Sequence, residues 1–526
     1  MNYEEASLHF RRRVCIIRPL AVSLVVILLA LIKGYGSDDE NVRLKLLGTV
    51  KTKSSTQITD SPWGIQAGSQ DESVVAKAAE IGVKWTRLQA TWAEIESERG
   101  VYNWEKTDKA FSAALKNGIT PFVTINGTNK LYVSTRTDLD PKVMELYGNI
   151  PLPPTSDPRA LKAWLAFVEK LVVRYKDQIK YWEIWNEPNH FAFWGSEPSG
   201  KEYGALVKEG AVLIRKLDPQ ASVLAGALAG LDPKFTDDFL SAGNKDLVDI
   251  ITFHNYSIIP EERIYKAAEV WDVIRKHNPG IRLWQGECGS ASHSSTSGYR
   301  GASPWGPVIQ AKWLLRQSFT DTYFCRADMS NYFLLGFGRS RREPQKRDFL
   351  TRIDSILGYP EKGGSRVRAV GTNEKCLLDN PSMKPKPGFF AYQNLCAVMD
   401  RRYKPTEIKH GITIKDTGVF SGIGPDDDAF PSVPLVASYR TDKGRSLLAY
   451  WLPWHPQEII RTATIDLKVM DIEFNEPVLV DLLSGRVYNL AEISKTDKEI
   501  VFRNIPLADY PFILMEKDDI ELVSKK

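Results

Sequence analysis

The chain has 526 residues, which is enough for a barrel of about 250 residues and a second domain. Its hydrophobic content of 43% and its charged content of 25% are those of an ordinary globular protein. The formal net charge of +4 is small for this length, so bulk charge does not indicate nucleic-acid binding.

Residues 1–36 predict an export segment. Three arginines at 11–13 precede an uncharged apolar run at 19–32. This run fits the core of a signal peptide better than a spanning helix of about 20 residues. We expect either a cleaved signal peptide or a membrane anchor, so the protein would be secreted, periplasmic or tethered to a membrane. Residues 37–60 are polar and predict a spacer with room for one early strand.

Residues 61–404 predict an alternation of strands and helices that is typical of a (β/α)8 TIM barrel, an α/β fold. Short runs of branched and aromatic residues predict strands, and amphipathic stretches predict helices. The expected strands are 61–68, 83–88, 119–125, 181–187, 222–230, 248–256, 281–290 and 328–334. The expected helices include 72–81, 160–176, 203–217, 308–319 and 388–395.

Two of the expected strands end in a glutamate. The run from Tyr181 ends in Asn186, Glu187 and a proline, which cannot continue a sheet ladder. The run at 281–290 contains Glu287 between two nearby glycines, which allow close approach of other groups. The separation, 287 − 187 = 100 residues, gives room for about three βα units, so these would be strands four and seven. Two carboxylates at strand tips in one cleft are what glycoside hydrolysis requires.

The motif Trp-Glu-Ile-Trp-Asn-Glu-Pro-Asn and the second glutamate resemble the clan A glycoside hydrolases, which are retaining enzymes on a TIM barrel. The motif is most similar to that of family 39, with family 5 next, and the resemblance covers residues 61 to 400. It implies that Glu187 is the acid/base, that Glu287 is the nucleophile and that Asn186 binds the sugar 2-hydroxyl. The expected function is hydrolysis of O-glycosidic bonds in a poly- or oligosaccharide by double displacement.

The same resemblance adds three polar residues around the nucleophile. Arg87, in the second expected strand, would lie beneath Glu287, where a guanidinium favours the ionised carboxylate. The alternative for Arg87 is a simple structural ion pair. His254 and Tyr256 share one face of the sixth expected strand by period-two spacing. In the clan such residues border the site, and the tyrosine contacts the nucleophile.

Four aromatic residues are candidates for sugar stacking, with core packing as the alternative for each. They are Trp63, Trp92, Trp194 and Tyr332. Many clan members carry a tryptophan at the tip of strand eight, where this chain has Tyr332 and Phe333. No Cys-x-x-Cys motif or histidine cluster indicates a metal site, and we expect no cofactor.

The stretch 338–387, after the last barrel strand, is rich in arginine and lysine. A basic rim there would attract an anionic glycan, such as a uronate or a sulfated sugar. The alternative is an ordinary solvated face. The expected partner is therefore a carbohydrate, either neutral or anionic, and the sequence does not specify the sugar, the linkage or the oligomeric state.

Residues 405–526 predict an antiparallel β-sandwich, because short alternating strands recur between turn signals. The expected strands are 435–439, 446–451, 463–467, 478–482, 500–502 and 512–515. A second hypothesis for the whole chain is a non-catalytic carbohydrate-binding protein on a glycosidase-like barrel, because a fold does not determine a function.

Overall fold

The computed structural model describes residues 44–67, 72–136, 150–257, 259–292, 306–336, 375–379, 382–416 and 433–523. The export segment expected at 1–36 and most of the basic stretch at 338–387 lie outside this set. Among the described helices, none combines the length and apolar character needed to cross a bilayer.

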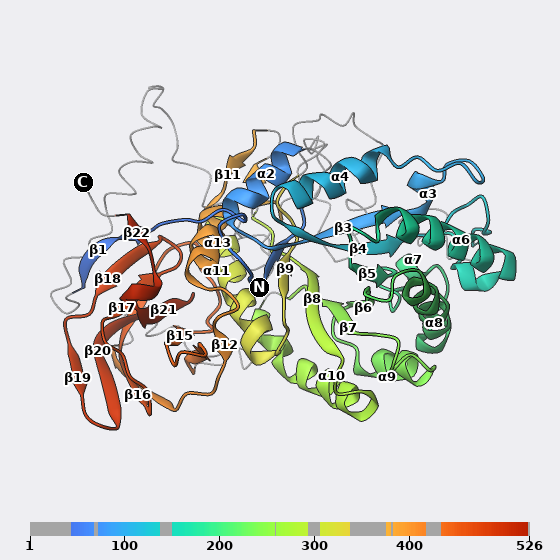
Figure 1. The fold of residues 1–526 in the computed structure, drawn as a ribbon. Coiled ribbons are helices and arrows are strands. Elements are labelled where there is room, and N and C mark those ends of the chain that lie inside the picture. The colour runs from blue at the N-terminus through green and yellow to red at the C-terminus, as the bar shows by residue number, and fades with distance from the viewer. Residues whose placement is uncertain are drawn as a thin grey trace, which may run out of the picture. The chain divides into compact units, whose positions relative to one another are not determined.

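Eight parallel strands close into a barrel, in which each strand pairs with the next in the chain and the last pairs with the first (Figure 1). The predicted TIM barrel is thus confirmed. Its strands are β2 (Trp63–Ile65), β3 (Trp85–Thr91), β4 (Thr120–Asn126), β5 (Tyr181–Ile184), β6 (Ser222–Ala229), β7 (Ile250–His254), β8 (Arg282–Cys288) and β9 (Ser330–Tyr332). The strands that carry the two glutamates are fourth and seventh in the barrel, as expected.

Helices follow the barrel strands in the chain and lie outside the barrel (Figure 1). They are α2 (Glu72–Ile81), α3 (Trp92–Ile95), α4 (Glu105–Lys116), α6 (Pro158–Tyr175), α7 (Phe191–Trp194), α8 (Gly200–Leu217), α9 (Pro233–Ser241), α10 (Ile264–His277), α11 (Pro307–Phe319) and α13 (Pro387–Val398). Short single turns are η2 (Pro154–Ser156), η3 (Pro260–Arg263) and η5 (Thr320–Phe324), and β10 (Leu378–Asp379) pairs with β11 (Lys384–Pro385).

The barrel interior changes from apolar to charged along its strands. Its lower layer is an apolar cluster of Trp85, Phe122, Leu224, Ile250, Trp284 and Met329. Side chains two residues further along a strand lie on the same face, one layer higher. This step leads from Trp85 to Arg87 on β3, and from Ile250 to Thr252 and His254 on β7. The apolar layer therefore forms a floor, and the polar side chains lie above it toward the carboxyl ends of the strands.

The C-terminal part contains two antiparallel sheets, as predicted, which contribute to one hydrophobic core. The larger has the order β12-β14-β15-β21-β17-β18-β1-β22, and the smaller has the order β13-β16-β20-β19. The strands are β12 (Lys404–Pro405), β13 (His410–Asp416), β14 (Leu435–Arg440), β15 (Ser446–Trp451), β16 (Thr462–Met470), β17 (Pro477–Asp481), β18 (Arg486–Asn489), β19 (Ile493–Lys495), β20 (Glu499–Ala508), β21 (Phe512–Glu516) and β22 (Leu522–Val523), with η7 (Lys517–Asp519) before the last.

One strand of the larger sheet comes from the region expected to be a spacer. Strand β1 (Lys45–Val50) lies between β18 and β22 and pairs antiparallel with both. The sequence left room for one early strand there, but the polar composition did not indicate its partners, because β1 buries only part of its side chains. The region before the barrel is thus more than a spacer, because it contributes a strand to the larger C-terminal sheet.

Buried charges join α11 of the barrel to the C-terminal sheets. Lys312 donates to both carboxylate oxygens of Asp509, at 2.8 and 3.0 Å. Arg316 forms two bonds to Glu261 in η3, at 2.8 and 2.7 Å, and Trp451 of β15 donates to the same glutamate at 2.7 Å. Because η3 follows β7, the C-terminal part supports the loop that carries Tyr256.

Candidate active site

Glu187 lies just beyond β5, on backbone that bends sharply. Trp185 and Glu187 have φ values of +72° and +48°, in the left-handed region that non-glycine residues rarely adopt. The Glu187 amide donates to the carbonyl of Ala227 at 2.9 Å, which fixes this bend against the end of β6. Strained backbone of this kind is concentrated at functional sites. The bend brings the carboxylate to the carboxyl-terminal mouth of the barrel.

Glu287 lies near the end of β8 and receives two strong hydrogen bonds. Arg87 Nη1 donates to its Oε2 at 2.7 Å, and the Tyr256 hydroxyl donates to its Oε1 at 2.7 Å. Both contacts were predicted from the sequence. Nearby, a Cβ on Gly289 would overlap the carbonyl oxygen of Phe333, so only glycine fits at that position.

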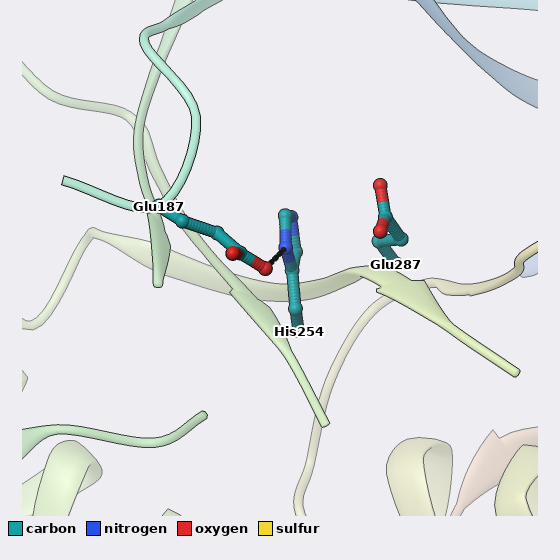
Figure 2. A group of neighbouring side chains, drawn as sticks. All are labelled: Glu187, His254 and Glu287. Carbon is teal, nitrogen blue, oxygen red and sulfur yellow. Dashed lines mark hydrogen bonds and ion pairs between the residues drawn. The ribbon is translucent and has the colours of Figure 1, made fainter. Parts of the chain in front are cut away.

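His254 lies between the two glutamates, as Figure 2 shows. Its Nδ1 is 2.8 Å from Glu187 Oε1, and its ring is fully buried. One carboxylate oxygen of Glu187, one of Glu287 and one ring nitrogen of His254 all lie within 4.8 Å of one another. Inverting glycosidases hold their carboxyl groups about 6.5–9.5 Å apart, and retaining ones about 5–5.5 Å. The close approach therefore favours the retaining arrangement.

The surroundings of Glu287 keep it ionised. Burial acts to raise the pKa of the Glu287 carboxyl, but the neighbouring His254 and the positive charge of Arg87 act to lower it. The hydrogen bond from Tyr256 and the charge of Lys375 lower this pKa further, so the net shift is downward. Burial and the charge of Glu287 raise the pKa of Tyr256, which therefore remains a neutral hydrogen-bond donor.

A fully buried carboxylate beneath the site, Glu183 of β5, was not singled out from the sequence. Arg87 donates to its Oε2 through Nε at 2.8 Å and through Nη2 at 2.5 Å. Nη2 also donates to Asn186 Oδ1 at 2.9 Å, which leaves the Asn186 amide nitrogen to act as a donor. The available signal was a lone acidic residue inside an apolar strand, on the face opposite to Trp182.

The aromatic candidates do not line the cleft in this structure. Trp63, Trp92 and Trp194 are each 0% exposed, and Tyr332 is 4% exposed. Each makes internal hydrogen bonds: the Trp63 indole to the Met399 carbonyl, the Trp92 indole to Glu96, the Trp194 indole to Glu202, and the Tyr332 hydroxyl to two backbone carbonyls. These four residues pack the core, which was the alternative interpretation, and we do not assign them to substrate. In the short helix α7 after Glu187, Phe191 and Phe193 are partly exposed.

Glu187, His254 and Glu287 are also the described side chains grouped closely enough to hold a metal ion. Both carboxylates already contact protein groups: Glu187 contacts the histidine, and Glu287 contacts an arginine and a tyrosine. An arginine that donates to a ligand oxygen competes with a cation for it. The set of donors therefore fits acid–base and nucleophilic chemistry better than metal coordination.

Comparison with known families identifies a relationship consistent with this geometry. Residues 80–270 match the family model of glycosyl hydrolases family 39. The matched range includes Arg87, Asn186, Glu187, His254 and Tyr256 and ends before Glu287. The predicted resemblance to family 39 is confirmed, and the match supports a glycoside hydrolase.

Solved structures share the fold over most of the chain. A family 39 glycoside hydrolase from the gut symbiont Bacteroides cellulosilyticus WH2 is 17% identical, with a TM-score of 0.57 over 87% of this chain and 81% of that one. A monomeric beta-xylosidase from Caulobacter crescentus CB15 is 16% identical, with a TM-score of 0.51 over 89% of this chain and 98% of that one. At such identity the likeness establishes the fold.

Among curated proteins, the chain is similar to the aryl-phospho-beta-D-glucosidase BglA of Bacillus subtilis (strain 168). The two are 26% identical over 121 residues, which is 22% of each chain. The match thus spans about a fifth of that relative's length, and its activity is a property of that protein.

Proposed function

We propose that this chain, a relative of the family 39 glycoside hydrolases, is a retaining O-glycosidase. The observation that carries the proposal is the pairing of Glu187 and Glu287 at the barrel mouth, with oxygens within 4.8 Å. The different partners of the two carboxylates support different roles. Glu287 contacts a cation and a phenol that keep it ionised, whereas Glu187 contacts the His254 imidazole at 2.8 Å.

In the proposed reaction, the Glu187 carboxyl group donates its proton to the leaving-group oxygen while Glu287 attacks the anomeric carbon. The glycosidic bond breaks, and a covalent glycosyl-enzyme forms. Glu187, now ionised, accepts a proton from water as the water attacks the same carbon and releases Glu287. Arg87 and Tyr256 aim the nucleophile, and the Asn186 amide donates to the sugar 2-hydroxyl.

The test is sugar release from aryl glycosides and oligosaccharides, including xylosides and uronides, followed by ¹H NMR of the first anomer formed. We expect the product to have the same anomeric configuration as the substrate. Glu187→Gln should reduce turnover by about 10²–10⁴-fold, the usual contribution of acid–base catalysis, and Glu287→Gln should abolish it. Glu269→Gln, an exposed carboxylate on α10, serves as the matched control and should retain activity.

Release of the opposite anomer would refute the retaining mechanism. Absence of release, with glycan binding equal in the wild type and both variants, would instead favour the non-catalytic binding protein. The described residues favour the enzyme over that second function, because both carboxylates are present and each contacts the partner that the proposed reaction needs.

Two finer features of the proposal concern the substrate and the location. We propose a preference for anionic glycans, supported by the Lys375 charge close to Glu287 and by the basic composition of 338–387. We also propose export, either secreted or tethered, on the sequence of residues 1–36 alone. Comparison of sulfated or uronate substrates with neutral ones tests the first feature, and fractionation of expressing cells tests the second.

A further inference from the structure

Glu183 is a carboxylate that the proposed reaction does not use, and it is 0% exposed inside the barrel. An ionised carboxylate costs several kcal/mol to bury unless it is paired and hydrogen-bonded. Here its oxygens accept hydrogen bonds from three strands. Arg87 of β3 and Thr124 of β4 donate to Oε2, and Thr252 of β7 donates to Oε1 at 2.6 Å. So complete a set of donors fixes Glu183 in one position.

The guanidinium of Arg87 is shared between two carboxylates. Nε and Nη2 face Glu183, and Nη1 faces Glu287. Because the guanidinium is planar and its donors are in a fixed fork, fixing two of them fixes the direction of the third. The position of Glu183 therefore determines where Nη1 meets the nucleophile.

The shared cation also couples the charges of the two carboxylates. Burial acts to lower the pKa of Arg87, but Glu183 and Glu287 raise it more, so the guanidinium remains charged. The other titratable groups around this pair are His254, Glu187, Tyr256 and Lys375 around Glu287, and the Tyr203 phenol near Glu183. One positive charge thus faces two carboxylates. A negative charge on Glu183 repels a negative charge on Glu287, and this repulsion partly cancels the attraction of Glu287 to Arg87.

We infer that Glu183 is a positioning residue, which aims Arg87 at Glu287 and offsets part of its charge so that Glu287 remains a strong nucleophile. The inference rests on the proposed function, because it assigns Glu287 the attacking role. It differs from a purely structural role in one respect. A structural residue affects the folded fraction, whereas Glu183 also sets the protonation of Glu287 and its rate of attack.

The experiment compares Glu183→Gln, Glu183→Asp and a matched control, Asp509→Asn, which disrupts a buried ion pair between α11 and the C-terminal part, away from the site. Glu183→Gln leaves Arg87 uncompensated, so the acidic limb of kcat/KM should move to lower pH by about one unit. Its kcat should fall tenfold or more. Glu183→Asp restores the charge but retracts the carboxylate, so the limb should return to the wild-type position while kcat stays low. The control variant should leave the position of the acidic limb unchanged, and it should leave kcat per folded molecule unchanged.

An acidic limb that stays in place in Glu183→Gln would overturn the inference, and so would full kcat in Glu183→Asp. If the glutamine variant fails to fold, by circular dichroism, the kcat of the aspartate variant decides alone. NMR titration of ¹³C-labelled glutamate, assigned to Glu287 with Glu287→Gln, follows the same shift without turnover. A shifted titration in a protein that hydrolyses no glycan would sustain the coupling and refute only the proposed activity.

Discussion

Asp321 should make this protein less stable as the pH rises through neutrality. The residue lies in η5 beneath the barrel, fully buried, with Ser330 and Gln317 donating to its carboxylate oxygens. Burial raises the pKa of Asp321 to about 8, and these two hydrogen bonds only partly oppose the shift. At neutral pH the folded protein therefore keeps a proton that the unfolded chain has released.

The sign and size of the effect follow from this difference. The stabilisation from the neutral carboxyl group is fully present below the unfolded pKa of 3.8 and is lost as the pH rises toward 8. One proton bound only by the folded state costs about 1.4 kcal/mol of unfolding free energy per pH unit. Over this window of about four units, the loss of stability has an upper bound of about 6 kcal/mol.

Asp321→Asn removes the titration and keeps the shape of the side chain. We expect urea unfolding at pH values from 5 to 8 to show that the free energy of unfolding of the variant, relative to that of the wild type, increases by about 1 kcal/mol per pH unit. Asp272→Asn, an exposed carboxylate on α10, is the matched control and should track the wild type. Parallel stability curves for Asp321→Asn and the wild type would refute the reasoning, because the buried carboxyl group would then titrate as it does in the unfolded chain.

Three further changes test the site and its supports. Tyr256→Phe removes a hydrogen bond to a charged group, worth about 1.5–3 kcal/mol, so the acidic limb of the pH–rate profile should move upward by about one unit or more. An unmoved limb would show that the bond to Glu287 is absent in solution. Gly289→Ala should lower the melting temperature by several degrees, because a Cβ there overlaps the backbone, whereas Gly411→Ala meets no atom within 4 Å and serves as the control. Glu261→Gln leaves the buried Arg316 without its ionic partner, so the free energy of unfolding in denaturant should fall by about 3–5 kcal/mol. A fall below about 1 kcal/mol would contradict the burial of that pair.

Strand periodicity predicted the barrel and both glutamate positions well. The positions of Glu187 and Glu287 in the chain follow from where a strand ends, and Pro188 and Gly289 mark those ends in the sequence. Arg87 and Tyr256 were found because a family motif gave them a place. Local pattern therefore sufficed wherever a residue's role follows from its own strand.

Residues whose role depends on the whole fold could not be predicted in the same way. The burial of Trp92 results from Tyr132 and Phe167, which stack on it from other segments of the chain. A tryptophan in a core and one in a sugar subsite have the same local pattern, so composition favoured neither. Glu183 was missed because a charge inside a strand becomes meaningful only when the neighbouring strands supply its donors.

The place of β1 in the larger sheet has a consequence for how the chain is made. Lys45 of β1 pairs with Asn489 of β18, a separation of 489 − 45 = 444 residues. At synthesis rates of about 5–20 residues per second, β1 waits roughly 20–90 seconds for this partner to emerge from the ribosome. All eight barrel strands are synthesised during that interval, so the barrel has time to form while β1 is still unpaired. The larger sheet can be completed only after β18 and β22 have been synthesised, so the exposed edges of β1 must stay free of other partners during that interval.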